Sequence, residues 1–442
     1  FWPLGRCGPA EIPGKERPGA AFPQLVLEKA PFLAMALAVG AVTIHFQGLK
    51  GAVGTFGDYP FSLRAGNAVV SYAAYLGNLL WPAGLAAYYP HPGSALGTGR
   101  VIAAALMLLA VTLLALQQRR RRPYLTAGWL WYLVMMAPVS GLIQAGSQGM
   151  ADRFLYLPAI GLYIAVVWGL AESAVLRPRA RQVLAAAALA ALMVAARSQV
   201  EHWRDDGALF RRALAVTEGN FFAHNNLGNF LYQNGRSAEA VVEWRKALAI
   251  NPRNATSIYN LAVAAEEGGD RPEAASLYRE ALNMNPRFAK AHWARARLAR
   301  LLAEGGEMEE ALEQARAAVR MKPRDGSSRF ALGGVLMRSG RHREALEHYE
   351  AIGRIDPKSI AGHYNRANAL AAIGLDNDSA DAYRTVLRLD PDDMASHNNL
   401  GRVLERLGEY DGAAHHYREA LRLDPGSVFA RENLDALEAR RR

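Results

Sequence analysis

Six prolines mark a regular spacing along the second half of this chain. They are separated by 34, 37, 34, 34 and 34 residues, and each follows an asparagine, an aspartate or, once, a lysine: Pro252, Pro286, Pro323, Pro357, Pro391 and Pro425. A period of this length is typical of a repeated pair of helices. Because one helix pair cannot bury its apolar face alone, the spacing predicts six units that stack on one another.

Small and aromatic residues recur at fixed positions inside these units, which we number so that Phe221 is the first position of the first unit. The eighth position is small in every unit: Gly228, Ala262, Ala296, Gly333, Ala367 and Gly401. The twentieth is small as well: Ala240, Ala274, Ala311, Ala345, Ser379 and Ala413. Four positions later, five units carry an aromatic residue and the third carries Ala315: Trp244, Tyr278, Tyr349, Tyr383 and Tyr417. Facing small residues let two helices approach closely, and the ring fills the remaining gap.

This pattern resembles the tetratricopeptide repeat over nearly all of residues 221–425. The resemblance implies a superhelix of helix pairs with a concave inner wall that serves as a binding surface. The third unit has three extra residues, which we place in the turn 303–308 because glycine tolerates a longer loop there. Residues 427–442 are expected to form the last, solvated helix.

Charge and cysteine content narrow the class of protein. The chain has 51 basic and 41 acidic residues, and the excess lies in short clusters beside apolar segments. This distribution is typical of membrane proteins, so we do not expect nucleic acid as a partner. The single Cys7 cannot form an internal disulfide. A Pro/Gly-rich lead that starts with Phe1 suggests a fragment whose true start lies upstream.

Six apolar blocks in the first half predict membrane segments. They are residues 30–46, 68–89, 101–116, 124–144, 154–171 and 183–196. The second block is amphipathic, so crossing the membrane and lying in its interface both remain open. The sixth has fourteen residues, which cover about two-thirds of a hydrocarbon core. Its alternative interpretation is the first helix of a cytoplasmic array.

Two arginine clusters predict the orientation. Residues 119–122 are all arginine, and Arg177, Arg179 and Arg181 follow the fifth block. Both clusters should be cytoplasmic by the positive-inside rule. One further crossing then places the array on the non-cytoplasmic side. Residues 200–220 match the second half of one more repeat, which we expect to join the array rigidly to the membrane part.

Five segments of the membrane half carry a second resemblance: 27–32 (LEKAPF), 75–82 (YLGNLLWP), 88–93 (YYPHPG), 128–131 (GWLW) and 151–158 (ADRFLYLP). They are similar to the later membrane half of the transmembrane and tetratricopeptide repeat-containing proteins, which are C-type glycosyltransferases. The resemblance spans about residues 25–425. It implies a lipid-phosphate-sugar donor and transfer of a sugar, mannose in the eukaryotic members, to protein hydroxyl groups on the non-cytoplasmic side.

The chain departs from that family at the catalytic base. The resemblance implies an acidic residue in the first non-cytoplasmic loop, and nothing before Glu28 fits such a loop. We therefore expect the catalytic N-terminal half to be missing from this chain and the chain alone to be inactive as a transferase. We assign no catalytic residue, no cofactor and no metal site.

Three polar residues near the fifth block are candidates for binding the donor lipid phosphate: Asp152, Arg153 and Gln144. An ionisable pair beside a membrane is costly unless it is partnered or hydrated. Arg153 would hold the phosphate through two parallel hydrogen bonds, oriented by Asp152. The alternative is a structural pair that caps a helix at the water interface.

Asparagines recur at the sixth position of four units and predict a ladder along one wall. These are Asn226, Asn260, Asn365 and Asn399, and Asn225, Asn229, Asn368 and Asn398 thicken the polar lining. An amide offers a donor and an acceptor that match a peptide unit of any sequence. The arrangement resembles the ladder of the O-linked N-acetylglucosamine transferase, which holds extended polypeptide. Ala294 and Ala331 interrupt it, and a purely structural role is the alternative.

We predict an all-α protein: a polytopic membrane helix bundle followed by a tetratricopeptide α-solenoid. The expected parts are a disordered lead at 1–27, a bundle of five or six segments at 28–199, a connector at 200–220, six repeats at 221–426 and a capping helix at 427–442. The leading hypothesis is the acceptor-handling part of a glycosyltransferase in a bacterial inner membrane, with protein segments and polyprenyl-phosphate sugar as partners. The alternative is a non-catalytic membrane scaffold for protein–protein interaction and envelope complex assembly.

Overall fold

The computed structural model describes residues 60–82, 84–142, 148–172 and 177–441, with a few isolated positions between 30 and 42. The predicted first membrane block and Gln144 therefore lie largely or wholly outside the described residues. The chain divides into two units, Phe1–Ile250 and Asn251–Arg442, which we describe separately. Apart from two short strands, the regular structure of the described residues is helical, which confirms the predicted all-α class.

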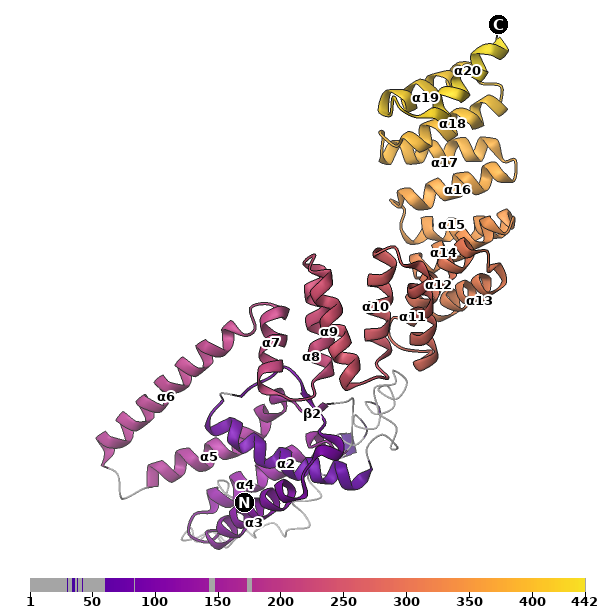
Figure 1. Ribbon diagram of the computed structural model, residues 1–442. Helices are drawn as coiled ribbons and strands as arrows, with labels where there is room; N and C mark the ends of the chain where they lie inside the picture. The colour runs from indigo at the N-terminus through magenta and orange to yellow at the C-terminus, as the bar shows by residue number, and fades with distance from the viewer. Residues whose placement is uncertain are drawn as a thin grey trace. The chain divides into compact units, whose positions relative to one another are not determined.

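The first unit begins with the helices of the membrane half (Figure 1). Its described elements are α2 (Phe61–Leu80), β1 (Tyr89–Pro90), η1 (Gly93–Ala95), α3 (Thr98–Gln117), α4 (Pro123–Met136), η2 (Ala137–Val139), β2 (Gln148–Met150), η3 (Asp152–Leu155), α5 (Tyr156–Glu172), α6 (Pro178–Glu201), α7 (Asp206–Val216), α8 (Phe221–Gln233) and α9 (Ser237–Ile250). Strands β1 and β2 pair antiparallel and hold two loops of the membrane half together.

Three described helices are long and apolar enough to cross a membrane: Thr98–Gln117, Asp152–Glu172 and Arg179–Glu201. They indicate association with a membrane. The last of them contains the predicted sixth block, residues 183–196, at the centre of the 24-residue helix α6. At 1.5 Å per residue this helix is about 36 Å long, and the apolar window that qualifies it buries nothing against the protein. The helix therefore extends beyond the fourteen apolar residues into charged residues at both ends.

Helices α4 and α5 pack with their backbones in contact. A Cβ atom on Gly128 would lie 2.2 Å from the carbonyl oxygen of Gly161, and one on Gly161 would lie 2.5 Å from the carbonyl oxygen of Gly128. Small residues at such crossings replace the hydrophobic drive that is absent between helices in lipid. At 14 residues, α4 is shorter than the three spanning candidates.

The loop after α2 attaches the first repeat to the membrane half. The side chain of Asn220, which also caps α8, donates a hydrogen bond of 3.1 Å to the carbonyl oxygen of Tyr88. The ring of Tyr88 stacks on that of Phe222 with centroids 4.4 Å apart. Helix α7, inside the predicted half-repeat, packs on α8, where Gly207 lies against the ring of Phe230.

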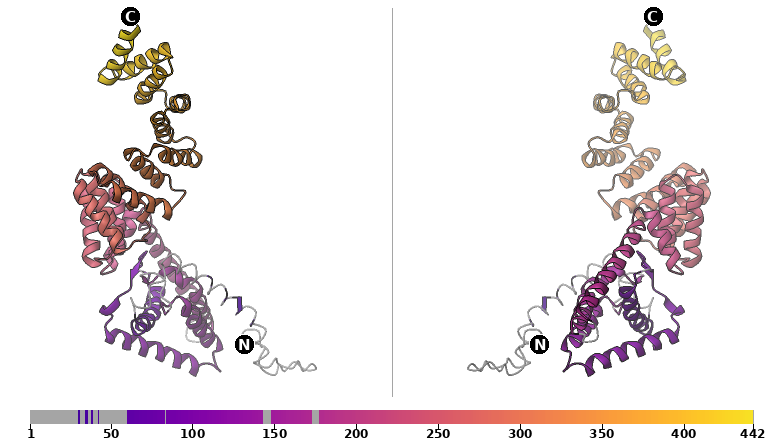
Figure 2. Two further views of the ribbon diagram at one scale, coloured as in Figure 1. Left: turned by 90° about the vertical axis from the view of Figure 1, so that its right-hand side faces the viewer. Right: turned by 90° about the vertical axis from the view of Figure 1, so that its left-hand side faces the viewer.

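The second unit is a stack of helix pairs (Figure 2). Its elements are α10 (Ala255–Glu267), α11 (Arg271–Met284), α12 (Ala291–Gly305), α13 (Met308–Met321), α14 (Gly326–Arg338), α15 (His342–Ile355), α16 (Ile360–Ala372), α17 (Asp376–Leu389), α18 (Met394–Arg406), α19 (Tyr410–Leu423) and α20 (Val428–Arg441). Several first helices begin at a side-chain cap two residues after the repeat proline: Asn254, Asp325, Ser359 and Asp393. Such caps each stabilise a helix end by about 1 kcal/mol.

The small and aromatic positions pack as predicted in the five repeats that carry the ring. In the third repeat the small position, counted back from Gly306 as Gly228 is from Gly235, is Ala299 and not the predicted Ala296. A Cβ atom on Gly401 would lie 2.6 Å from the ring of Tyr417, and one on Gly228 would lie 2.5 Å from the indole nitrogen of Trp244. All five aromatic rings at this position are at most 2% exposed. In the fifth repeat, the Ser379 hydroxyl donates a hydrogen bond of 2.9 Å to the carbonyl oxygen of Ala367.

The predicted location of the extra residues in the third repeat is wrong. In each repeat a glycine with positive φ lies in the turn between the two helices, seventeen residues before the proline: Gly235, Gly269, Gly306, Gly340, Gly374 and Gly408. Only two residues separate α12 from α13, so that turn is not lengthened. Two of the three extra residues lie instead between α11 and α12, where six residues separate the helices and four do so between the other repeats, and the third extends the start of α12. That turn is packed: Phe288 is 6% exposed, and the Lys290 ammonium donates to the Asn260 side chain at 3.1 Å.

Candidate peptide-binding groove

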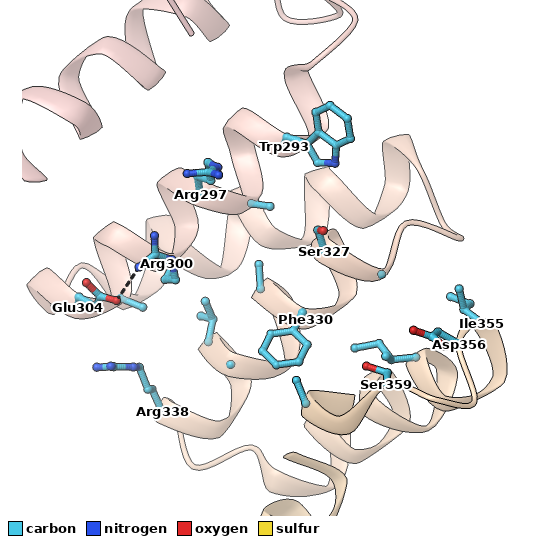
Figure 3. A pocket seen from close by; sticks show the side chains of 18 of the residues that line it. Trp293, Arg297, Arg300, Glu304, Ser327, Phe330, Arg338, Ile355, Asp356 and Ser359 are labelled. Carbon is cyan, nitrogen blue, oxygen red and sulfur yellow. Dashed lines mark hydrogen bonds and ion pairs between the residues drawn. The ribbon is translucent and has the colours of Figure 1, made fainter. Parts of the chain in front are cut away.

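A groove of about 920 Å³ lies along α12 and α14, the inner helices of the third and fourth repeats, with further lining residues from α10, α15 and α16 (Figure 3). Three small residues on α12 and α14 leave the space open: Ala296, Ala331 and Gly334. Aromatic side chains border it, with Trp293 39% exposed and Phe330 half-buried. Because a concave shape and an apolar lining are typical of binding sites, this groove is a candidate peptide-binding site.

Two of the three groove arginines are neutralised within the protein. The Glu266 carboxylate, whose side chain is 8% exposed, pairs with Arg297 at 3.0 Å and also with Arg300. Arg300 reaches Glu304 as well, at 3.2 Å. The same Glu266 accepts a hydrogen bond of 2.7 Å from the Tyr278 hydroxyl. This cluster joins the second and third repeats and fixes two guanidinium groups along the groove edge.

The third arginine differs from the other two. Arg338 lies in the last turn of α14, is exposed, and forms no ion pair among the residues that the structure describes. Figure 3 shows it with Arg300 and Glu304 at one end of the groove, and Ile355, Asp356 and Ser359 at the opposite end. The groove therefore has a cationic end with one uncommitted charge.

The opposite end is polar but locally engaged. The Ser359 hydroxyl caps α16 by accepting from the backbone nitrogen of Gly362 at 3.1 Å. The Asp356 carboxylate accepts from the backbone nitrogen of Lys358 at 3.0 Å. Phe330 lies between the two ends and makes an edge contact with the buried Tyr349 ring, with centroids 5.8 Å apart.

The predicted ladder asparagines have diverse partners. The amides of Asn226 and Asn365 are exposed and donate to carbonyl oxygens of their own helices at 2.8 and 2.9 Å. Asn260 is buried and accepts from Lys290, whereas Asn399 donates to the Tyr364 hydroxyl at 3.0 Å. The last two contacts tie structural elements together, as the structural interpretation expects.

The secondary asparagines mostly support packing. Asn229 accepts from the Trp244 indole at 3.3 Å, and the backbone carbonyl of the buried Asn225 accepts from the same group at 3.2 Å. Asn368 accepts from the Tyr383 hydroxyl, and Asn398 accepts from Asn433 at 2.9 Å. These contacts orient aromatic rings and neighbouring helices within the array.

Sequence reasoning missed the residue that occupies the ladder position of the third repeat. Counted back from Gly306, as Asn226 is counted from Gly235, that position is Arg297 and not Ala294. The glycine of the inter-helix turn could have given the correct alignment. Each turn needs a residue with positive φ, so this glycine lies at the same place in every repeat. The groove arginines were therefore hidden by a three-residue error in alignment.

The candidate donor residues of the membrane half do not form a pair. Asp152 accepts hydrogen bonds from the Asn78 amide at 3.1 Å, the Tyr89 hydroxyl at 2.9 Å and the backbone nitrogen of Ala86 at 3.3 Å. Arg153 is exposed and lies over the ring of Phe154, 5.0 Å from its centroid. Asp152 thus holds the end of α2 and the following loop, and Arg153 is left open to solvent or lipid. The third candidate, Gln144, lies outside the described residues.

Comparison with known families agrees with this fold. A family model described as tetratricopeptide repeat matches residues 259–302, 297–360 and 364–428, and one described as TPR repeat matches 228–269. The second half of the chain is a tetratricopeptide-repeat array. This fold binds proteins or peptides, which is the coarser of the partner predictions.

Curated relatives connect the array to a named enzyme group. Protein O-mannosyl-transferase TMTC1 of Mus musculus is 29% identical over 145 residues, which are 32% of this chain and 15% of that protein. Tmtc2 of Drosophila melanogaster is 32% identical over 106 residues, 23% of this chain and 11% of that protein. TMTC4 of Mus musculus is 31% identical over 154 residues, 33% of this chain and 20% of that protein. This chain is a tetratricopeptide-repeat relative of the protein O-mannosyl-transferases, and it matches no more than 20% of the length of these three.

Solved structures also resemble the array at low identity. YrrB, described as a TPR protein with an unusual peptide-binding site, is 21% identical with a TM-score of 0.37, covering 42% of this chain and 95% of that one. PilF of Pseudomonas aeruginosa is 24% identical with a TM-score of 0.43, covering 48% of this chain and 95% of that one.

Proposed function

We propose that this chain is a membrane protein whose repeat array binds extended protein segments and presents them for sugar transfer from a lipid-linked donor. The observation that carries the first half of this proposal is the groove on the inner helices α12, α14 and α16. It combines an apolar floor with charged ends, as sites for extended peptides do. Similarity to protein O-mannosyl-transferases supports the second half.

Filling the groove tests peptide binding. A Cβ atom on Gly334 would meet nothing within 4 Å, so Gly334→Leu is expected to fold normally while its side chain occupies the groove. The full chain in detergent micelles would be titrated with a random library of fluorescent 12-residue peptides. We expect Gly334→Leu to reduce the affinity for the peptides that bind the wild type by at least about tenfold. Disruption of a contact at the centre of an interface typically costs more than about 1 kcal/mol of binding free energy, and about 1.4 kcal/mol corresponds to a factor of ten. Gly334→Ala is the matched control and should keep most of the binding.

Absence of any library peptide that binds the wild-type chain would contradict this proposal. Equal binding by wild type and Gly334→Leu would place the binding surface elsewhere on the array.

For the lipid-linked donor we propose Arg153 as the phosphate ligand. It is exposed, adjoins a helix long enough to cross a membrane, and retains the donors that a phosphate needs. Asp152 would act indirectly, by holding the loop that adjoins the site. Retention of a polyprenyl-phosphate sugar by the chain in nanodiscs should fall in Arg153→Ala and not in Arg179→Ala, which removes an exposed arginine at the start of α6. Equal retention by both variants would remove Arg153 from the site.

A second function rests on the same groove without catalysis. In that case the array is a scaffold on the non-cytoplasmic face of a bacterial inner membrane and assembles envelope proteins. The intact mass of the endogenous protein, recovered through a C-terminal tag, separates the two. A mass large enough for several further membrane helices supports the transferase, and a mass near 48.1 kDa supports the scaffold.

A further inference from the structure

The groove contains space for one large side chain of a partner. Ala331 and Gly334 lie on the groove face of α14 beside Phe330, and nothing lies within 4 Å of the position that a Cβ on Gly334 would take. Trp293 is partly exposed on the neighbouring helix. A flat polar wall would serve to bind backbone alone, whereas a cavity with an aromatic floor favours a bulky apolar side chain.

The asparagine ladder is absent where this space occurs. In the third and fourth repeats the ladder position holds Arg297 and Ala331, while asparagines occupy it in the fifth and sixth repeats. Asparagine amides, which could bind the backbone of a partner whatever its side chains, are therefore missing here. Their place is taken by an apolar cavity with charged residues at its edge. Binding at these two repeats depends on the partner's side chains.

The charges at the cationic end of the groove favour a partner side chain of one sign of charge. Glu266 already pairs with Arg297 and Arg300, so these guanidinium groups are largely compensated. Arg338 is exposed and has no ion pair among the described residues. An arginine in this situation attracts a carboxylate and disfavours a lysine or arginine of the partner.

Helix geometry gives the distance between the apolar space beside Phe330 and the charge of Arg338. Phe330 and Arg338 are eight residues apart on α14, which is about 12 Å along a helix axis. An extended peptide advances about 3.3 Å per residue, so this distance corresponds to roughly three to four residues. Flexibility of the arginine side chain widens the range to roughly two to four.

We infer that the groove recognises an extended acidic segment in which a bulky apolar residue enters the space beside Phe330 and an aspartate or glutamate two to four residues away binds Arg338. This inference rests on the proposed peptide-binding function and adds the sequence class of the partner. The binding would be selective for acidic segments and would weaken with salt, because the pair at Arg338 is exposed.

The test uses defined 12-residue peptides with a glycine/serine background. Each carries one phenylalanine and, three residues before or after it, an aspartate or a lysine. Binding to the full chain in detergent micelles would be measured by fluorescence anisotropy at 50 mM and at 500 mM salt. We expect the aspartate peptide of one direction to bind about three- to tenfold more tightly than its lysine partner at the lower salt, and the difference to shrink at the higher salt.

Two charge-reversal variants separate a specific contact from general attraction. Arg338→Glu should abolish or reverse the preference for aspartate. Arg343→Glu makes the same change in net charge at an exposed arginine of α15 outside the groove and should retain it. An equal effect of both variants would overturn the assignment of the carboxylate to Arg338.

The outcomes distinguish this inference from the proposed function beneath it. If aspartate and lysine peptides bind equally well and Gly334→Leu still abolishes binding, the groove binds peptides and the acidic specificity is wrong. A further set of the same peptides has alanine in place of phenylalanine. If these bind as tightly as the phenylalanine peptides, the apolar space has no role in recognition. If no library or defined peptide binds the wild type, the peptide-binding function itself is wrong.

Discussion

Two adjacent glycines of α14 allow packing to be measured separately from helix propensity. Gly333 faces the second helix of its repeat, where a Cβ atom would lie 2.8 Å from two ring carbons of Tyr349. That ring is 1% exposed and cannot move aside without disturbing the core. Gly334 faces the groove, where a Cβ atom meets nothing within 4 Å. Neither glycine has a positive φ, so alanine fits the backbone at both positions.

The substitutions Gly333→Ala and Gly334→Ala should therefore have opposite effects. Both gain about 1 kcal/mol of helix propensity. Only Gly333→Ala also overpacks the core, at a cost of about 1–3 kcal/mol. Because the propensity gain is common to both, the difference between the two variants isolates this packing cost.

Amide hydrogen exchange can measure this difference in local stability at α14 and α15, since repeat arrays open locally and need not unfold as one unit. The amides of α14 and α15 in Gly333→Ala should exchange about 5- to 100-fold faster than in Gly334→Ala, as 1.4 kcal/mol corresponds to a factor of ten. The amides of α19, far along the chain, serve as an internal reference. Equal exchange of α14 in the two variants would refute the close contact between Gly333 and Tyr349.

Three further predictions follow from other parts of the structure. Burial next to His397 and His415 lowers the pKa of His416 to about 4, so the unfolded chain, with a histidine pKa of about 6.5, takes up the proton first. The contribution of neutral His416 to the stability of the α18–α19 pair should be full above about pH 6.5 and be lost as the pH falls towards about 4. Hydrogen exchange corrected for intrinsic rates can follow this loss, and a pH profile unchanged in His416→Gln would contradict the assignment to His416. Glu266→Gln should destabilise the α10–α12 contact by about 2 kcal/mol in urea unfolding. The matched variant Glu239→Gln removes an exposed ion pair and should change stability much less, and similar losses in the two variants would show that Glu266 is not a buried ion-pair partner. Alkaline phosphatase fused to the carboxyl terminus should be active in a bacterial host if the array is non-cytoplasmic, and an inactive but stable fusion would place the array in the cytoplasm.

The helix pairs could be predicted from the sequence because their determinants are local. A small residue and an aromatic residue sixteen positions apart specify one packed pair, and this signal occurs in five of the six units. The sequence alignment of the third repeat with the others is wrong because the spacing between the repeat prolines gives only the total length of a unit. The position of the extra residues depends on backbone conformation, which Gly306 records through its positive φ and the proline does not.

The candidate sites were less predictable because they depend on contacts between distant residues. The pairing of Asp152 with Asn78 and Tyr89 joins positions 74 and 63 residues apart. No local pattern indicates that Asp152 would be occupied in this way while Arg153 is exposed. Likewise, the groove exists where side chains from the second to the fifth repeat leave space. The groove residues are of common types. They form a site only because the alignment of the stacked repeats brings them together.

The extra residues between α11 and α12 have a consequence for the curvature of the array. In stacked repeats, the rotation from one unit to the next is set at each interface, and identical interfaces give a uniform superhelical pitch. The inserted length lies mainly in the connection between α11 and α12, which has six residues where the other connections between repeats have four. A longer connection permits a different rotation at this one step, and Phe288, Lys290 and the carboxylate of Glu266 hold the two repeats together across it. The groove follows directly along α12 and α14, so the part of the inner wall that lacks ladder asparagines adjoins the longest connection between the described repeats.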